Sequence, residues 1–240
     1  MLSKIIVLTW LCAAEAFSGS SSIIRPCNRN DEACITQSAN IAMPLIAAGI
    51  PALGVDGFDP MHLEEASGVV ENFVFNFTNN DAVGYSKCII SGLQMNLNAM
   101  TLKFDFICPR VDLSGHLVSS GILLDVPVWG DDDYKISVNK YLVKVNAKIE
   151  KVMGNDGEMH MFIVVLDHKE SALAPIDFKN YALKQKTKLD AEAEALFEKN
   201  KFVKAIELIS ETYIDGLFKI AFKNVNKFLA TIPFDDLFLD

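Results

Sequence analysis

The chain has 240 residues and a formal net charge of -9, and 50% of its residues are hydrophobic, with 16 phenylalanines among them. The acidic balance argues against binding to nucleic acid or to anionic membrane surfaces, because both require basic patches. The length suits one domain. The apolar content predicts either a large core or an apolar surface that lines an interior space.

The first 16 residues have the pattern of a secretory signal peptide. Lys4 precedes an apolar stretch from Ile5 to Ala14, and Ala14-Glu15-Ala16 fits the small-x-small cleavage rule. We therefore expect residues 1–16 to be removed and residues 17–240 to form a single secreted domain. The alternative, an N-terminal membrane anchor, requires a longer apolar run. The rest of the sequence has no stretch of the ~20 apolar residues that span a bilayer, so we expect no stable membrane insertion.

Strand patterns dominate the middle of the chain. A helix is predicted over residues 33–49, kinked at Pro44, and a loop follows it through Pro60. The predicted strands cover residues 69–78, 85–97, 102–108, 113–126, 134–153 and 159–165. A turn at residues 154–157 and the lack of intervening helices predict consecutive hairpins, hence an antiparallel sheet. Glycines within the strands predict that the sheet is curved. Residues 170–180 are predicted to be a connector.

A single long helix is predicted from Asn200 to about Thr231. Its apolar residues recur at a spacing of three to four and occupy nearly every side of the helix. A helix of this kind must be surrounded, and it would be on the order of 45 Å long. The predicted fold class is α+β, a long C-terminal helix wrapped by a curved antiparallel sheet that encloses an elongated hydrophobic tunnel. That geometry favours binding of an elongated apolar molecule.

Four cysteines remain after cleavage of the signal peptide, and an oxidising compartment favours their pairing. Cys27 and Cys34 bracket a short polar loop before the first helix, and we expect them to pair. Four cysteines allow three pairings, and sequence alone does not choose between them. If the two strands that follow Gly84 form a hairpin, Cys88 falls opposite Cys108, and we expect these two to pair. A bulge at Gly92 that shifts the register, or two buried free thiols, is the alternative.

Asn76-Phe77-Thr78 is an N-glycosylation sequon. It lies at the end of a predicted strand, just before a polar segment. We expect Asn76 to be glycosylated; the alternative is an unused sequon at a buried edge.

Several short segments follow one another in a characteristic order: Cys27 and Cys34, Gly49-Ile50-Pro51 with Asp59-Pro60, the run from Gly115 to Gly130, Leu196-Phe197-Glu198-Lys199-Asn200, and Pro233-Phe234-Asp235-Asp236-Leu237-Phe238. In this order they resemble the insect takeout and haemolymph juvenile-hormone-binding protein family, in particular its takeout branch. The resemblance covers essentially the whole mature chain. It implies a long helix in a curved antiparallel sheet, with an extended hydrophobic tunnel inside.

The chain departs from the pattern of that family at several positions. His116 or Leu117 stands where the family usually has tyrosine, and Ser120 replaces an arginine. Asp131-Asp132 replaces the second glycine of a loop. The pair of Cys88 and Cys108 is not typical of the family either. These departures are consistent with a diverged member whose ligand has changed.

The apolar faces of the predicted strands and of the long helix supply the candidate lining of the tunnel. Its methionines suit an irregular apolar shape, and Tyr213 has a polar tip that could hydrogen-bond a ligand head group. The candidates are Phe73, Phe75, Phe104, Phe106, Met159, Met161, Phe202, Ile206, Tyr213 and Phe218.

Motifs for catalysis are lacking in the sequence. It has no nucleophile elbow, P-loop or dinucleotide-binding glycine pattern. The four histidines, His62, His116, His160 and His168, do not have the spacing of metal ligands. Residues 131–133 could hold calcium, but a solvated hairpin turn is the favoured interpretation. We predict no catalytic residue, no metal site, no cofactor and no enzymatic activity.

Two functions follow from these observations. The first is a secreted carrier of a long hydrophobic small molecule such as a terpenoid hormone, fatty acid, isoprenoid or semiochemical. The alternative is a secreted module of the same broad fold that recognises a lipid surface or a protein partner without transporting a ligand. An esterase is a third possibility, without a motif to support it. The expected partner is a hydrophobic small molecule and not nucleic acid, and the sequence identifies no protein receptor.

Overall fold

The computed structural model describes residues 23–172, 177–180 and 199–239, and the predicted signal peptide lies outside these residues. In chain order the elements are β1 (Cys27–Asn28), α1 (Glu32–Ala48), the 3-10 turn η2 (Pro51–Leu53), β2 (Met61–Val70), β3 (Asn72–Val83), the 3-10 turn η3 (Tyr85–Lys87), β4 (Ile89–Asn96), β5 (Thr101–Leu123), β6 (Val126–Met153), β7 (Met159–Ala172), β8 (Asp177–Asn180), α3 (Lys199–Leu229), the 3-10 turn η5 (Asp235–Leu237) and β9 (Phe238–Leu239). Among the described helices, none is long and apolar enough to cross a membrane.

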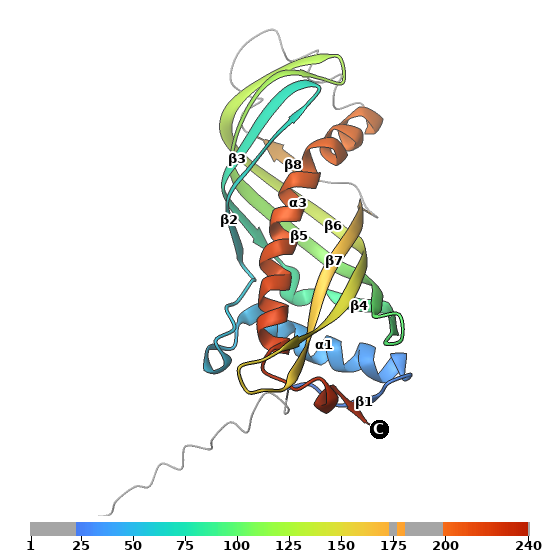
Figure 1. The fold of residues 1–240 in the computed structure, drawn as a ribbon. Helices are drawn as coiled ribbons and strands as arrows, with labels where there is room; N and C mark the ends of the chain where they lie inside the picture. The colour runs from blue at the N-terminus through green and yellow to red at the C-terminus, as the bar shows by residue number, and fades with distance from the viewer. Residues whose placement is uncertain (1–22, 173–176, 181–198, 240) are drawn as a thin grey trace, which may run out of the picture.

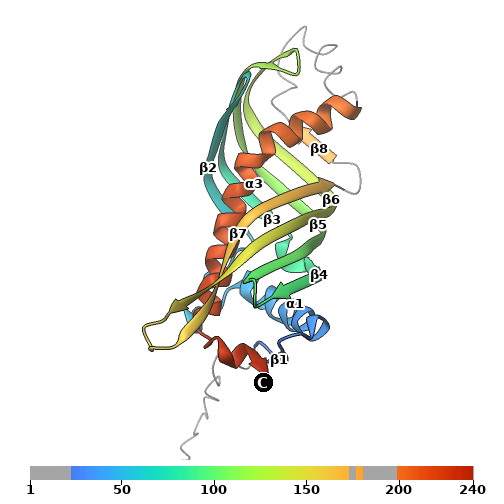
Figure 2. The ribbon, with the colours of Figure 1, turned by 45° about the vertical axis from the view of Figure 1, so that its right-hand side comes forward.

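The central feature is a seven-stranded antiparallel sheet that curls around α3 (Figure 1, Figure 2). Its order is β2-β3-β5-β6-β7, with β4 paired to β5 and β8 paired to β6. The two longest strands, β5 with 23 residues and β6 with 28, run through the whole molecule. β4 pairs with the first part of β5 and β3 pairs with its second part. The predicted fold class, a long helix in a curved antiparallel sheet, is confirmed.

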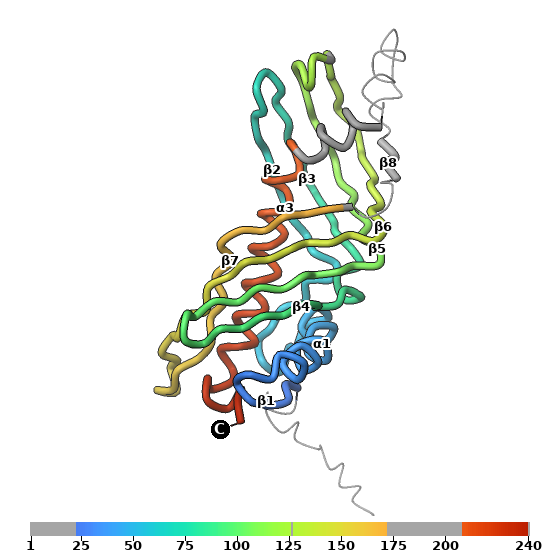
Figure 3. Tube along the Cα trace, turned by 90° about the vertical axis from the view of Figure 1, so that its right-hand side faces the viewer, coloured from blue at the N-terminus to red at the C-terminus, as the bar shows by residue number. Residues whose placement is uncertain are grey.

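The molecule has two halves, and the long strands β5 and β6 run through both of them (Figure 3). We call the end that holds α1, β4 and the β6–β7 turn the lower half, and the end that holds the β2–β3 and β5–β6 turns the upper half. The short parallel pair of β1 and β9 lies beside α1 at the bottom of the lower half (Figure 1).

The strand boundaries differ from the predicted ones at two turns. β2 was missed, and Val69 belongs to it, because the β2–β3 turn consists of only two residues, Glu71 and Asn72, and begins at Glu71 with φ of 53°. The predicted turn at residues 131–133 is wrong, since these residues lie inside β6 and pair with β5. The β5–β6 turn is instead made by Leu124 and Asp125, with φ of 49° and 67°. Positive φ is rare without glycine or asparagine, so neither turn carries the usual sequence signal.

Smaller differences affect four other segments. The segment from Tyr85 begins as a 3-10 turn and becomes a strand only at Ile89. The two strands predicted over residues 102–108 and 113–126 are one continuous strand. β7 extends to Ala172, and β8 lies within the predicted connector.

The long helix α3 has 31 residues, close to the predicted bounds, which corresponds to a length of about 46 Å. The expectation that it is apolar on nearly every side is wrong. Glu211, Asp215, Lys219 and Lys223 are exposed at intervals of four residues, which places them along one side of the helix. The sheet therefore covers α3 as an open half-barrel and leaves a charged strip facing the solvent.

Two asparagines fix the helices to the edges of the sheet in the lower half. The side chain of Asn40 in α1 donates to the carbonyl of Ile90 in β4 (2.8 Å) and accepts from its N–H (2.7 Å). The side chain of Asn226 in α3 makes the same pair of bonds with Ile163 in β7, at 2.9 and 2.8 Å. Each side-chain amide thus makes, with one residue of an edge strand, the two hydrogen bonds that a neighbouring strand would otherwise make. As a result, α1 and α3 are held at fixed positions on either side of the same interior space.

The structure contains both expected disulfide bonds. Asp31 caps α1 by accepting from the N–H of Cys34 (2.9 Å), and Cys34 bonds to Cys27, with Cα atoms 5.7 Å apart. Cys88 bonds to Cys108, with Cα atoms 4.1 Å apart. The register of the hairpin shifts after Ser91, beyond the bond, so the irregularity expected near Gly92 leaves the Cys88–Cys108 pair in place. Two disulfides fit an oxidising compartment.

Candidate ligand-binding site

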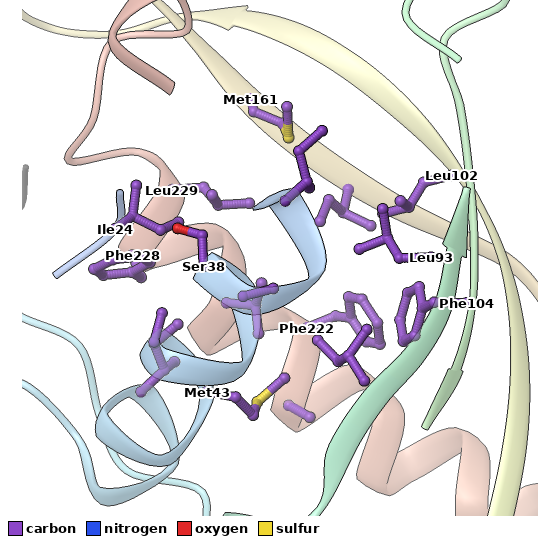
Figure 4. Close-up of a pocket in the computed structure, with 18 of the residues that line it drawn as sticks. Ile24, Ser38, Met43, Leu93, Leu102, Phe104, Met161, Phe222, Phe228 and Leu229 are labelled. Carbon is purple, nitrogen blue, oxygen red and sulfur yellow. The ribbon is translucent and has the colours of Figure 1, made fainter. Parts of the chain in front are cut away.

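An apolar cavity of about 170 Å³ lies in the lower half, between α1, the inner face of the sheet and α3 (Figure 4). α1 contributes Ala39, Ala42 and Met43, and α3 contributes Ala221 and Phe222. From the sheet, the main contributors are Leu93, Leu102, Phe104, Phe106 and Met161. Such a lining suits the apolar part of a ligand and provides binding free energy by removing apolar surface from water.

The polar groups in the lower part of this lining satisfy each other. The hydroxyl of Ser38 donates to the carbonyl of Arg25 (2.9 Å) and accepts from its N–H (2.8 Å). Cys27 is engaged in its disulfide. This end of the cavity therefore favours a purely hydrocarbon segment of the ligand.

The size of the cavity limits what it holds in this conformation. An apolar cavity of ~150 Å³ takes a ligand as small as benzene, while pockets for larger ligands measure roughly 300–1,000 Å³. A long ligand thus requires side chains to move. Met43, Met95 and Met161 line the cavity, and methionine side chains adjust to irregular shapes with little strain.

Tyr85, Tyr141 and Glu170 lie near enough to influence one another's ionisation, and we call them the polar belt. Tyr85 lines the cavity, and its ring stacks on Phe106 with centroids 6.4 Å apart. Burial raises the pKa of Tyr141 well above its ordinary value, and nearby Tyr85 and Glu170 raise it further. Burial likewise raises the pKa of Glu170. The hydroxyl of Tyr141 is buried and has no hydrogen-bond partner among the described residues. Both tyrosines therefore remain protonated donors at physiological pH.

Three stacked rings separate the cavity from a polar groove between β7 and α3. Phe218 and Phe222 line both the cavity and the groove, which has a volume of about 860 Å³. The ring of His168 stacks flat on Phe218 at 4.6 Å, and Phe218 stacks on Phe222 at 5.8 Å. His168 Nε2 lies 2.7 Å from Asp215 Oδ1, and Nδ1 lies 2.9 Å from Glu170 Oε1. We call His168, Phe218 and Phe222 the ring wall.

The ten candidate lining residues do not all lie at the cavity. Phe104, Phe106, Met161 and Phe218 line the cavity. Met159 lies at the β6–β7 turn, where its carbonyl accepts from the N–H of Phe234. Phe202 and Ile206 belong to α3, but their side chains lie outside the described part of the structure.

Phe73, Phe75 and Tyr213 belong to a separate aromatic cluster in the upper half. Phe73, Phe75 and Phe77 form a ladder along β3, with successive ring centroids 6.1 and 5.7 Å apart. Tyr213 packs edge-on against Phe77 at 5.4 Å. Its hydroxyl lies 3.2 Å from that of Tyr134, and burial raises the pKa of Tyr213 to about 12. The polar tip of Tyr213 is thus engaged inside the protein core.

The cavity also has lining residues that the sequence analysis did not single out. Ala39, Ala42 and Met43 of α1 and Ala221 of α3 are the clearest examples. Ala39 and Ala42 were recognisable as part of the apolar face of a helix. Small side chains on facing helices are what leave room for a cavity, but their partner helix is not evident from sequence.

The histidines pair with carboxylates on the surface or at the end of the sheet. His116 lies between Asp131 (2.9 Å) and Asp133 (3.0 Å), and these hydrogen bonds raise its pKa. His160 is buried, and its imidazole contacts Asp156 and the carbonyl of Ile232. Within the described residues, no three His, Cys, Asp or Glu side chains are grouped as metal ligands.

Taken together, a curved antiparallel sheet, a long helix along its concave face and an internal apolar cavity define a protein class built around an internal hydrophobic site. The sequence matches the family described as haemolymph juvenile hormone binding protein (JHBP) over residues 5–239. The chain therefore belongs to this family.

Two relatives illustrate the match. The circadian clock-controlled protein daywake of Drosophila melanogaster is 25% identical over 248 residues, covering 97% of this chain and 94% of daywake. The crystal structure of Epiphyas postvittana Takeout 1 superposes with a TM-score of 0.78 at 21% sequence identity, covering 88% of this chain and 97% of Takeout 1. At that identity, the structural match supports the shared fold.

Proposed function

We propose that this protein is a secreted carrier of a long hydrophobic small molecule. The observation that carries the proposal is the apolar cavity enclosed between α1, the sheet and α3. Membership of a family named for binding juvenile hormone supports a ligand of this general kind. The two disulfides support an extracellular location. We propose that residues 1–16 are removed on secretion, so that secreted protein sequenced from its N-terminus should begin at or near Phe17.

The polar belt limits which chemical groups the polar end of the ligand can carry. Protonated hydroxyls of Tyr85 and Tyr141 would donate hydrogen bonds to a neutral oxygen such as that of an ester, ketone or alcohol. An anionic head group beside the belt would meet the half-buried carboxyl group of Glu170, and like charges repel more strongly there than in bulk water. We therefore propose a ligand with a hydrocarbon chain and a neutral polar end.

Native mass spectrometry of protein purified from secreting cells tests the carrier function directly. We expect a bound lipid that organic extraction releases. A complementary test compares the methyl ester, the alcohol and the free acid of one long chain at pH 8. The acid should bind at least tenfold more weakly than the ester, and Tyr141→Phe should selectively weaken the ester and the alcohol. If no lipid is bound and none of these compounds binds, the carrier proposal fails, and a recognition module without a transported ligand becomes the better interpretation.

The ring wall predicts a kinetic effect on ligand exchange. The stack of His168 on Phe218 helps to keep the Phe218 ring in place, and such a stack contributes about 0.5–1.5 kcal/mol. His168→Ala should therefore raise both the association and the dissociation rate of a fluorescent apolar probe by roughly 2–10-fold, with little change in Kd. Stopped-flow fluorescence measures both rates.

His62→Ala provides the matched control. His62 is also paired with a carboxylate, Asp81, at 3.1 Å, but it lies on β2 away from the ring wall. Its removal should leave both exchange rates unchanged. Equal rates for His168→Ala and the wild type would show that ligands do not pass the ring wall.

A further inference from the structure

An exposed apolar surface lies on the outer face of the sheet, in the upper half. It consists of Val69, Val74, Val118, Ile122 and Trp129, whose exposed fractions lie between 45% and 68%. We call these five residues the outer patch. They form one contiguous surface, because Val69 pairs with Val74, Val74 with Ser120, and Ser120 with Trp129 across three neighbouring strand pairs.

The outer patch has no role in the cavity. Along β3 the side chains of Phe73, Phe75 and Phe77 are buried in the interior, whereas Val74 points to the opposite face. Contiguous apolar patches on a soluble protein usually have something to cover them or to bind them. The question is therefore what covers this one.

The sequon lies on the same face, at the border of the outer patch. Asn76 is two residues from Val74 on β3, and its partners across the two neighbouring strands are Ser67 and Val118. Thr78, the third sequon residue, is on this outer face as well, and Phe77 between them points inward. The expectation that Asn76 lies at the end of a strand is wrong, because β3 continues to Val83.

The orientation of the Asn76 amide is consistent with modification. Its Oδ1 is buried without a hydrogen-bond partner among the described residues. Nδ2, the atom that carries an N-linked glycan, is not among the buried unpaired atoms of this part of the chain. The nitrogen therefore keeps contact with solvent, and no hydrogen bond within the described residues engages it.

We infer that Asn76 carries an N-linked glycan and that this glycan covers the outer patch. In the transfer, Nδ2 forms a bond to C1 of the first N-acetylglucosamine and loses a proton. The bond from C1 to the phosphate oxygen of the lipid pyrophosphate donor breaks, and the lipid pyrophosphate leaves. Transfer precedes completion of the sheet, because β3 pairs on both sides. A bulky, hydrated glycan at this position keeps other apolar surfaces away from the outer patch.

This inference rests on the secretory route of the proposed function but not on its ligand. The test uses the full chain expressed in a secretory eukaryotic cell line. Intact mass with and without a peptide N-glycosidase should show a glycan on the wild type and on Thr78→Ser, which keeps the sequon. Asn76→Gln and Thr78→Ala should lack it. In analytical ultracentrifugation, the two unglycosylated variants should self-associate at concentrations where the wild type and Thr78→Ser are monomeric.

A second substitution identifies the surface responsible. Adding Val74→Lys to Asn76→Gln should restore the monomer, because it places a charge in the middle of the outer patch. Secreted wild-type protein without a glycan would overturn the inference. So would unglycosylated variants that stay monomeric, or a glycosylated wild type that dimerises through the outer patch. Native mass spectrometry of Asn76→Gln tests the carrier function separately. Lipid bound to this variant would show that ligand binding does not depend on the glycan.

Discussion

Met161→Trp should abolish or strongly weaken ligand binding while the protein still folds. Met161 lies on β7, is 4% exposed and lines the cavity. A tryptophan ring at this position extends into the space that a ligand would occupy. We expect the affinity for a long-chain ester to fall at least tenfold, which corresponds to about 1.4 kcal/mol. Because the cavity accepts part of the added volume, the melting temperature of the ligand-free protein should change by only a few degrees.

Phe75→Trp is the matched control for this experiment. Phe75 is less than 2% exposed, packs between Phe73 and Phe77, and does not line the cavity. Gly68 lies against the tip of its ring, where even a Cβ would come within 2.6 Å. A larger ring should therefore overpack this region and lower the free energy of unfolding by about 1–3 kcal/mol, with unchanged ligand affinity. If Met161→Trp binds the ester like the wild type, the cavity is not the ligand site.

The contrast between these two positions shows what the sequence could predict. Alternation along β3 and β5 correctly placed Phe75 and Phe104 on the inner face of the sheet. The alternation did not indicate that Phe75 packs against other rings while Phe104 borders a cavity. That difference depends on which side chains face each phenylalanine from the other elements of the fold. On α3 and α1 the opposite side is Ala221, Ala42 and similar small residues. The pairing of these faces is set by tertiary structure, which periodicity does not encode.

Helix docking was also beyond prediction. The three-to-four spacing of apolar residues, sustained over some thirty positions, identified α3 with nearly correct ends. Nothing in that pattern indicated that Asn226 would hydrogen-bond the backbone of Ile163, or that Asn40 would do the same at Ile90. A polar residue on an otherwise apolar helix face gives no sign of its partner. These two contacts nevertheless set the positions of both helices that enclose the cavity.

Tyr134→Phe should lower the stability of the fold substantially and leave ligand affinity unchanged. The hydroxyl of Tyr134 donates to Asn80 Oδ1 at 2.7 Å, and Asn80 is fully buried. The amide of Asn80 in turn donates to the carbonyl of Leu63 at 2.9 Å. Removing the hydroxyl leaves a buried acceptor unpaired, which costs about 1–3 kcal/mol. For a protein of this size, each kcal/mol lowers the melting temperature by roughly 2–4 °C, which differential scanning calorimetry resolves.

Tyr213→Phe distinguishes the structural role of this cluster from the ligand contact that the sequence predicted for Tyr213. It removes the hydroxyl 3.2 Å from Tyr134 but leaves the Tyr134–Asn80 hydrogen bond intact. The free energy of unfolding should therefore fall by less than in Tyr134→Phe, by about 0.5–1.5 kcal/mol. Titration calorimetry with the long-chain ester should give the same Kd for wild type and variant, because Tyr213 is not part of the cavity lining. A tenfold weaker Kd in Tyr213→Phe, without loss of stability, would instead mean that the bound ligand extends past the polar belt into the aromatic cluster of the upper half.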